Sequence, residues 1–248
     1  MKQSNKVLLS LSIAAALTYG LPTIASAMHI MEGYLPAGLC VAWGVVCLPY
    51  LVWGWLSIRR KLEANRKVIV LLAISGAFIF VLSSLKIPSV TGSCSHMTGT
   101  GLGAILFGGG AVSILGLIVL VFQAILLAHG GLTSLGANTF SMAVAGPLAA
   151  LAVYKACKAL RVNRMVAVFL AASLGDLFTY CVTAFQLALA FPSAQGGVGA
   201  SMLKFLAVFS PTQLPLAVIE GILTVVILMG LETYAKSELA ELGHVVEA

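Results

Sequence analysis

Long apolar stretches follow one another along nearly the whole chain, and each has about the length of a membrane-spanning helix. They fall at about 36–57, 68–86, 101–128, 139–157, 165–191 and 211–234, and an α-helix needs roughly 20 apolar residues to cross a bilayer. Charged residues make up only 9% of the 248 positions, against about 25% in soluble domains. Because so few polar side chains cannot cover a soluble core, we predict an all-α integral membrane protein and exclude a soluble enzyme.

Basic residues cluster in two loops between these stretches, at 59–67 and 155–164, and so predict how the helices run. The positive-inside rule places both loops in the cytoplasm, so the net charge of +6 does not indicate nucleic-acid binding. An even number of crossings must separate the two loops. The stretch at 101–128 is interrupted by glycines at 108–110 and is therefore expected to form two short crossings or a re-entrant hairpin. The result is a multi-pass bundle of about seven transmembrane helices, with the 87–100 loop outside and the C-terminus cytoplasmic.

Residues 1–27 have the features of a cleaved secretory signal. A basic start precedes an apolar stretch at 7–17 that is too short to span a bilayer, and the Ala-Ser-Ala triplet at 25–27 matches a small-x-small cleavage site. We therefore expect a signal peptide over 1–27, followed by a single transmembrane domain over 28–248 that begins outside the membrane with a free amine at Met28. An uncleaved first helix is the alternative.

Cleavage at this position would make His29 the second residue of the mature chain, an arrangement that can bind a transition metal. The amine of Met28, the backbone nitrogen of His29 and an imidazole nitrogen of His29 can close fused chelate rings around one ion. A fourth nitrogen would complete the square that suits Ni(II), Cu(II) or low-spin Co(II). Uptake should weaken in acid, because an amine with a pKa of about 7.7–8.0 and an imidazole with a pKa of about 6.5 must both be neutral to bind. The alternative is an ordinary surface histidine.

His96 is the expected fourth ligand, since it lies in a loop of glycines and small hydroxyl residues on the same predicted side. Such a loop can fold into a bundle where protein or water surrounds its backbone. Cys94 is a softer candidate ligand near by. Glu32 and His129 are candidates for orienting the ligands through hydrogen bonds, although both residues also fit an interfacial position without any role in binding.

Two acids, Asp176 and Glu220, fall inside apolar stretches, where a charge costs about 2.5–3.5 kcal/mol on insertion scales. Each should face the bundle interior, either to hold helices together or to serve the function. An intramembrane enzyme that uses these acids or Cys94 has no supporting motif. The sequence also has no Gly-x-x-x-x-Gly-Lys-Ser/Thr element, so any ATP-driven step must come from a partner chain.

Four motifs carry a resemblance to a known family. They read MHIMEGYLP at 28–36, SLKIPSVTGSCSH at 84–96, TGTGLGA at 98–104 and AHGGLTSLGANTF at 128–140. Together they resemble the CbiM family, the substrate-binding membrane components (S-components) of energy-coupling-factor cobalt transporters. The resemblance extends over nearly all of 28–234.

The resemblance implies Co2+ uptake across the cytoplasmic membrane for cobalamin biosynthesis, with Co2+ as the transported substrate and no permanently bound cofactor. It implies that Met28, His29 and His96 hold the metal. It also implies a CbiN-like small membrane protein, a CbiQ-like transmembrane coupling protein and a CbiO-like ATPase as partners. Nickel relatives share the opening motif and the square geometry favours Ni2+, so nickel uptake is an alternative. An ATP-independent metal channel or secondary transporter is a second alternative.

Overall fold

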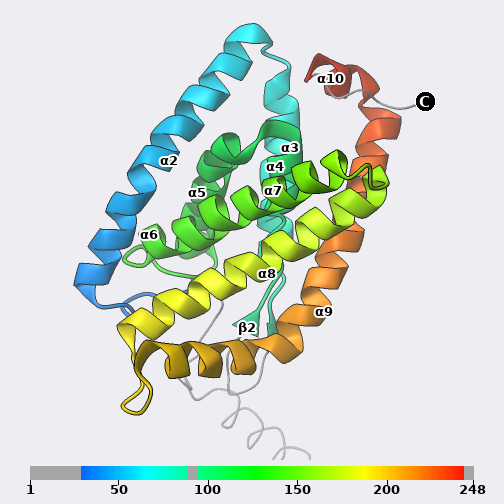
Figure 1. Ribbon diagram of the computed structural model, residues 1–248. Helices are drawn as coiled ribbons and strands as arrows, with labels where there is room; N and C mark the ends of the chain where they lie inside the picture. Colours follow the sequence, from blue (N-terminus) through cyan, green and yellow to red (C-terminus); the bar gives the residue numbers. More distant parts are fainter. Residues whose placement is uncertain (1–28, 89–93, 243–248) are drawn as a thin grey trace, which may run out of the picture.

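The computed structural model describes residues 29–88 and 94–242, which form a helical bundle with one short β-ladder (Figure 1). In this part of the chain, five helices are long and apolar enough to cross a membrane. They are α2 (Ala37–Ala64), α5 (Gly109–Leu126), the continuous run Leu135–Ala159, α8 (Arg164–Ala190) and α9 (Gly197–Tyr234). The other helices are α3 (Val68–Ser84), α4 (Thr100–Phe107) and α10 (Lys236–Glu241), and the ladder pairs β1 (Ile87–Pro88) with β2 (Cys94–Ser95). The predicted all-helical membrane class is confirmed.

The glycine-interrupted stretch forms a short helix and a long one that run antiparallel. All eight residues of α4 are buried, and eight residues extend only about 12 Å, much less than the roughly 30 Å of a bilayer core. The chain reverses at Gly108, whose φ of 84° is in the left-handed region. Gly103 then lies against Val112 across the turn. The stretch therefore contains one spanning helix, α5, and a buried half-length helix, as in a re-entrant hairpin.

The run Leu135–Ala159 is not a uniform α-helix. It consists of α6 (Leu135–Asn138), the π-helix η2 (Thr139–Ala145) and α7 (Gly146–Ala159). A close approach fixes α7 against α8, because a Cβ on Gly146 would lie 2.0 Å from the hydroxyl of Thr179. Single π turns within helices often occur at functional sites, and η2 lines the site described below.

Helix α9 begins at Gly197, well before the predicted start at residue 211, so that boundary was wrong. The helix continues through Pro211 and Pro215 and bends, as Figure 1 shows: its first part lies across the bundle and its second part rises along it. Proline interrupts the helical hydrogen bonds without ending a membrane helix when neighbouring groups satisfy the freed backbone.

The two basic loops lie at the same end of the molecule. Leu62 near the end of α2, Val68 at the start of α3 and Leu239 of α10 belong to one apolar cluster. Arg164 at the start of α8 forms an ion pair of 2.6 Å with Glu232 near the end of α9. Both basic loops and the C-terminal helix therefore meet at this end, while the β-ladder lies at the opposite one (Figure 1).

Candidate metal centre

Three histidines that are far apart in the sequence converge where the segment before α2, the loop after β2 and the turn after α5 meet. His29, His96 and His129 each offer a nitrogen, and these atoms lie within 4.8 Å of one another. Their side chains are 3%, 0% and 2% exposed. The structure thus brings together the two histidines predicted as ligands and the one predicted to assist them.

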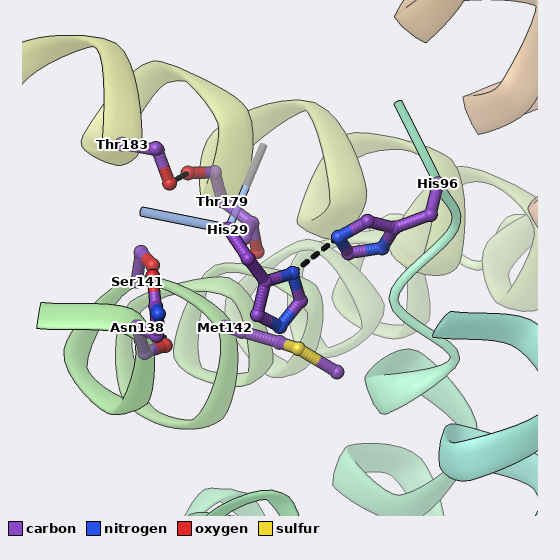
Figure 2. A pocket seen from close by; sticks show the side chains of 7 residues that line it. All are labelled: His29, His96, Asn138, Ser141, Met142, Thr179 and Thr183. Atoms are coloured by element: carbon purple, nitrogen blue, oxygen red, sulfur yellow. Dashed lines mark hydrogen bonds between the residues drawn. The ribbon is translucent and has the colours of Figure 1, made fainter. Parts of the chain in front are cut away.

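Two ring nitrogens face each other in the centre. Nδ1 of His29 and Nε2 of His96 are hydrogen-bonded, and Figure 2 shows the two rings pointing toward each other. Nδ1 of His96 lies 2.8 Å from the carbonyl oxygen of Met97. Because a carbonyl only accepts, Nδ1 of His96 carries the ring proton, and its Nε2 accepts the hydrogen bond from the Nδ1–H of His29. In His29, Nδ1 is the nitrogen close enough to its own backbone to close a six-membered chelate ring with the backbone nitrogen.

Burial keeps the three imidazoles neutral, the form in which they bind metal. Burial, followed by the proximity of His96 and His129, lowers the pKa of His29 well below its ordinary value. Burial likewise lowers the pKa of His96 to about 4 and that of His129 to about 2. A cation entering this centre would therefore meet uncharged imidazoles at neutral pH, each with one ring nitrogen that carries no proton.

Two of these nitrogens have no hydrogen bond within the described ranges, although they are buried. They are Nε2 of His29 and Nε2 of His129. Buried polar atoms are nearly always paired in native proteins, so each exception needs an explanation. For His129 a cation bound among the three rings would supply one, since its ring centroid lies 4.5 Å from that of His29 and 4.9 Å from that of His96.

Asn138, at the end of α6, fixes the backbone that follows His29. Its Oδ1 accepts from the Ile30 N–H at 2.8 Å, and its Nδ2 donates to the Ile30 carbonyl at 3.0 Å. The hydroxyl of Ser134 donates to the same carbonyl at 2.5 Å. Asn138 was not among the predicted site residues, although an asparagine next to a predicted membrane stretch was an available signal.

Glu32 lies on the neighbouring turn and does not contact the His29 ring through any described hydrogen bond. Its carboxylate accepts from the backbone N–H groups of Leu132 at 2.5 Å and Thr133 at 3.2 Å. Glu32 therefore fastens the segment that carries His29 to the turn after His129. Met28 and the predicted signal peptide 1–27 lie outside the described residues, as does the side chain of Cys94.

A narrow pocket lies beside the two facing histidines, and its lining is polar and hydroxyl-rich. Besides His29 and His96, it is lined by Asn138, Ser141, Met142, Thr179 and Thr183 (Figure 2). Asp176 of α8 and Glu220 of α9 are fully buried, as predicted. They belong to a hydrogen-bonded network: Glu220 accepts from Thr98 of the His96 loop, and Asp176 accepts from Gln213 of α9.

Bundle and site together define a class: a multi-pass helical membrane protein with a buried, neutral cluster of nitrogen donors at one end, suited to a transition-metal ion. The comparisons with known proteins give the family. Residues 29–238 match the CbiM family model, described as the cobalt uptake substrate-specific transmembrane region, and the chain belongs to this family.

Named relatives and solved structures agree with this assignment. The cobalt transport protein CbiM of Lachnoclostridium phytofermentans is 65% identical over 99% of this chain and 98% of its own length. That of Ruminiclostridium cellulolyticum is 55% identical over 96% of each chain. The crystal structure of a truncated transition-metal transporter superposes with a TM-score of 0.72 at 26% identity, covering 83% of this chain and 99% of that one.

Proposed function

We propose that this protein captures Co2+ at the outer face of the cytoplasmic membrane and passes it inward for cobalamin biosynthesis, as the substrate-binding component of an ATP-driven energy-coupling-factor transporter. The observation that carries the proposal is the facing pair of nitrogens, Nδ1 of His29 and Nε2 of His96, which are buried and neutral. Membership of the CbiM family and the cobalt transport proteins among the relatives support cobalt as the substrate.

The ion is held by four nitrogens from three residues. After removal of residues 1–27, the amine of Met28, the backbone nitrogen of His29 and Nδ1 of His29 form two fused chelate rings. Nε2 of His96 closes the square. The hydrogen bond that joins the two ring nitrogens is replaced by two bonds to the same ion, so His29 and His96 need only a small displacement. The ring proton of His29 moves from Nδ1 to Nε2, which has no described hydrogen-bond partner, and the amide proton of His29 is released to solvent. The whole of 28–248 then serves as one metal-binding transmembrane domain.

His129 supports cobalt over nickel. Four strong nitrogen donors in a square complete the coordination of Ni(II), whereas Co(II) accepts a further ligand outside the square. The third imidazole lies within reach of such an ion, and its Nε2 has no hydrogen-bond partner within the described ranges. Nickel uptake by the same mechanism is the second candidate, because the square of nitrogens would serve it equally well.

The energy for transport comes from partners. We assign ATP hydrolysis to a CbiO-like ATPase, coupling to a CbiQ-like transmembrane protein and an accessory role to a CbiN-like membrane protein; the chain itself transports and does not catalyse a reaction. With the two basic loops at one end, the positive-inside rule places that end and the C-terminus in the cytoplasm. The metal centre then faces outward.

The experiment that tests the site moves the amine. Insertion of one alanine between the cleavage site and Met28 leaves every side chain in place but separates the terminal nitrogen from His29 by one more residue. Calorimetric titration of the purified protein with Co2+ should show loss of tight binding, and mass measurement should confirm the extended terminus. Retained binding and uptake would overturn the chelate.

A second experiment tests the ATP-driven part. Vesicles that contain only this chain should bind Co2+ stoichiometrically and accumulate none, because the histidines are enclosed. Addition of the three partners and ATP should start accumulation. Accumulation by the chain alone would favour the channel or secondary-transporter alternative.

A further inference from the structure

A buried acid on α9 holds the loop that carries His96. Oε2 of Glu220 accepts from the backbone N–H of Thr98 at 2.6 Å. Its Oε1 accepts from the Thr98 hydroxyl at 2.8 Å and from the Gly99 N–H at 2.9 Å. Three donors of one short loop therefore converge on one carboxylate that is fully buried.

The same helix holds the loop at two earlier positions. Nε2 of Gln213 lies 3.3 Å from the carbonyl oxygen of His96 and donates to Oδ2 of Asp176 at 2.5 Å. The Ser95 and Thr212 hydroxyls are 2.7 Å apart. Each residue from Ser95 to Gly99 except Met97 is thus hydrogen-bonded to α9 through its side chain or backbone.

The loop has little freedom to take another path. Gly99 has a φ of 68°, and a Cβ there would lie 3.0 Å from the Cα of Ile79 in α3. The loop is therefore confined between α3 on one side and the α9 acceptors on the other. A shift of Thr98 and Gly99 would move the His96 ring, because only Met97 separates them.

We propose that Glu220 is a positioning residue for metal binding: it holds the 98–99 backbone so that Nε2 of His96 is presented to His29 as the fourth ligand. The inference rests on the proposed function and adds to it a role for a membrane-depth acid that touches no metal. A carboxyl group suits this task because its two oxygens accept from the Thr98 N–H, the Thr98 hydroxyl and the Gly99 N–H at the same time.

The test is the variant Glu220→Gln, which keeps the volume but replaces one acceptor oxygen by an amide NH2 that cannot accept from Thr98 or Gly99. Loss of a group that orients a ligand typically costs about 10–100-fold in metal affinity, and we expect a loss in this range for Co2+. The visible absorption of the bound Co2+ should change as well, since one ligand is displaced.

A double-mutant cycle separates positioning from general damage. In a His96→Ala background the nitrogens of the first two mature residues still bind Co2+ weakly, and there Glu220→Gln should have no further effect. The matched control is Thr224→Val, one turn along α9, whose buried hydroxyl donates only to the Glu220 carbonyl at 2.7 Å. That control should change the affinity by less than about twofold.

Three results would overturn the positioning role of Glu220, and a fourth would refute the proposed function. Wild-type affinity in Glu220→Gln, or an equal loss in the His96→Ala background, would overturn the positioning role. If Glu220→Gln does not fold, Thr98→Val removes one of the same hydrogen bonds from the loop side and should lower the affinity severalfold, again only when His96 is present; an unchanged affinity would overturn the proposal. Equal Co2+ binding by wild type and His96→Ala would instead refute the proposed function itself.

Discussion

His29 faces His96 through Nδ1, and this choice of nitrogen decides what kind of site the pair can form. Nδ1 can bind an ion together with the backbone nitrogen of its own residue, whereas Nε2 points away from the backbone and could only act as a single ligand. His96 contributes the opposite nitrogen, Nε2, because its Nδ1 is bonded to the Met97 carbonyl. In the proposed site, His29 is therefore the chelating residue and His96 the single ligand.

The third imidazole gives a prediction about ion choice. The variant His129→Ala should weaken Co2+ binding by about 10-fold or more and leave Ni2+ binding nearly unchanged, since a square of four nitrogens suffices for nickel. Competitive titration of the two ions measures the ratio directly. Ser141→Ala is the control, because its hydroxyl lines the same pocket but bonds to backbone carbonyls. Equal losses for both ions would show that His129 supports the site only structurally.

Residue types and their order in the chain were enough to predict His29 and His96. An imidazole behind a predicted cleavage site and another in a loop on the same predicted side indicate a nitrogen site without any tertiary information. Asn138 and Glu220 could not be assigned their roles in this way. Their partners lie 108 and 122 positions away along the chain, and only the packing of α6 and α9 against the two loops brings them together.

Helix α6 ends in the residue that fastens the segment carrying His29. Asn138 satisfies both backbone groups of Ile30, which is 1% exposed. In Asn138→Leu the Ile30 N–H would be buried without a partner, at a cost of about 1–3 kcal/mol. We expect thermal unfolding in detergent at a lower temperature, together with weaker Co2+ binding, because His29 is the next residue.

Asn163 provides a control that separates the loss of stability from the loss of Co2+ affinity. Asn163 caps α8 by accepting from the Met165 N–H at 2.9 Å, and Asn163→Ala should cost about 1 kcal/mol at the opposite end of the molecule. That variant should lower the unfolding temperature with Co2+ affinity unchanged. If Asn138→Leu also kept its affinity, Asn138 would serve folding alone.

The helices themselves were largely predictable, because a bilayer imposes a length and a composition that are visible in the sequence. The stretches at 139–157 and 165–191 match Leu135–Ala159 and α8 closely. Hydropathy could not predict the π-helix at Thr139–Ala145, which does not change the apolar character of the run. It also misplaced the start of α9, since Pro211 reads as a helix end in a soluble context but is only a bend here.

The basic loops and the cluster of three histidines lie at opposite ends of the molecule. The basic loops gather with α10 at one end, and the β-ladder, which leads directly into His96, lies at the other (Figure 1). The exposed apolar side chains of α2, such as Val45, Val52 and Trp55, fit a lipid-facing surface. The positive-inside rule predicts an orientation from the basic loops alone, with the end that carries them in the cytoplasm.

This orientation predicts which positions a membrane-impermeant maleimide can reach. In a variant without native cysteines, Lys86→Cys beside the β-ladder should react in intact cells, since Lys86 is exposed and lies on the side predicted to be outside. Arg60→Cys and Arg161→Cys, both exposed in the basic loops, should react only after the membrane is permeabilised. Uptake of Co2+ by each variant controls for correct insertion. Labelling of Arg60→Cys in intact cells would place the metal centre on the cytoplasmic side, where a site built on an exported amine could not form.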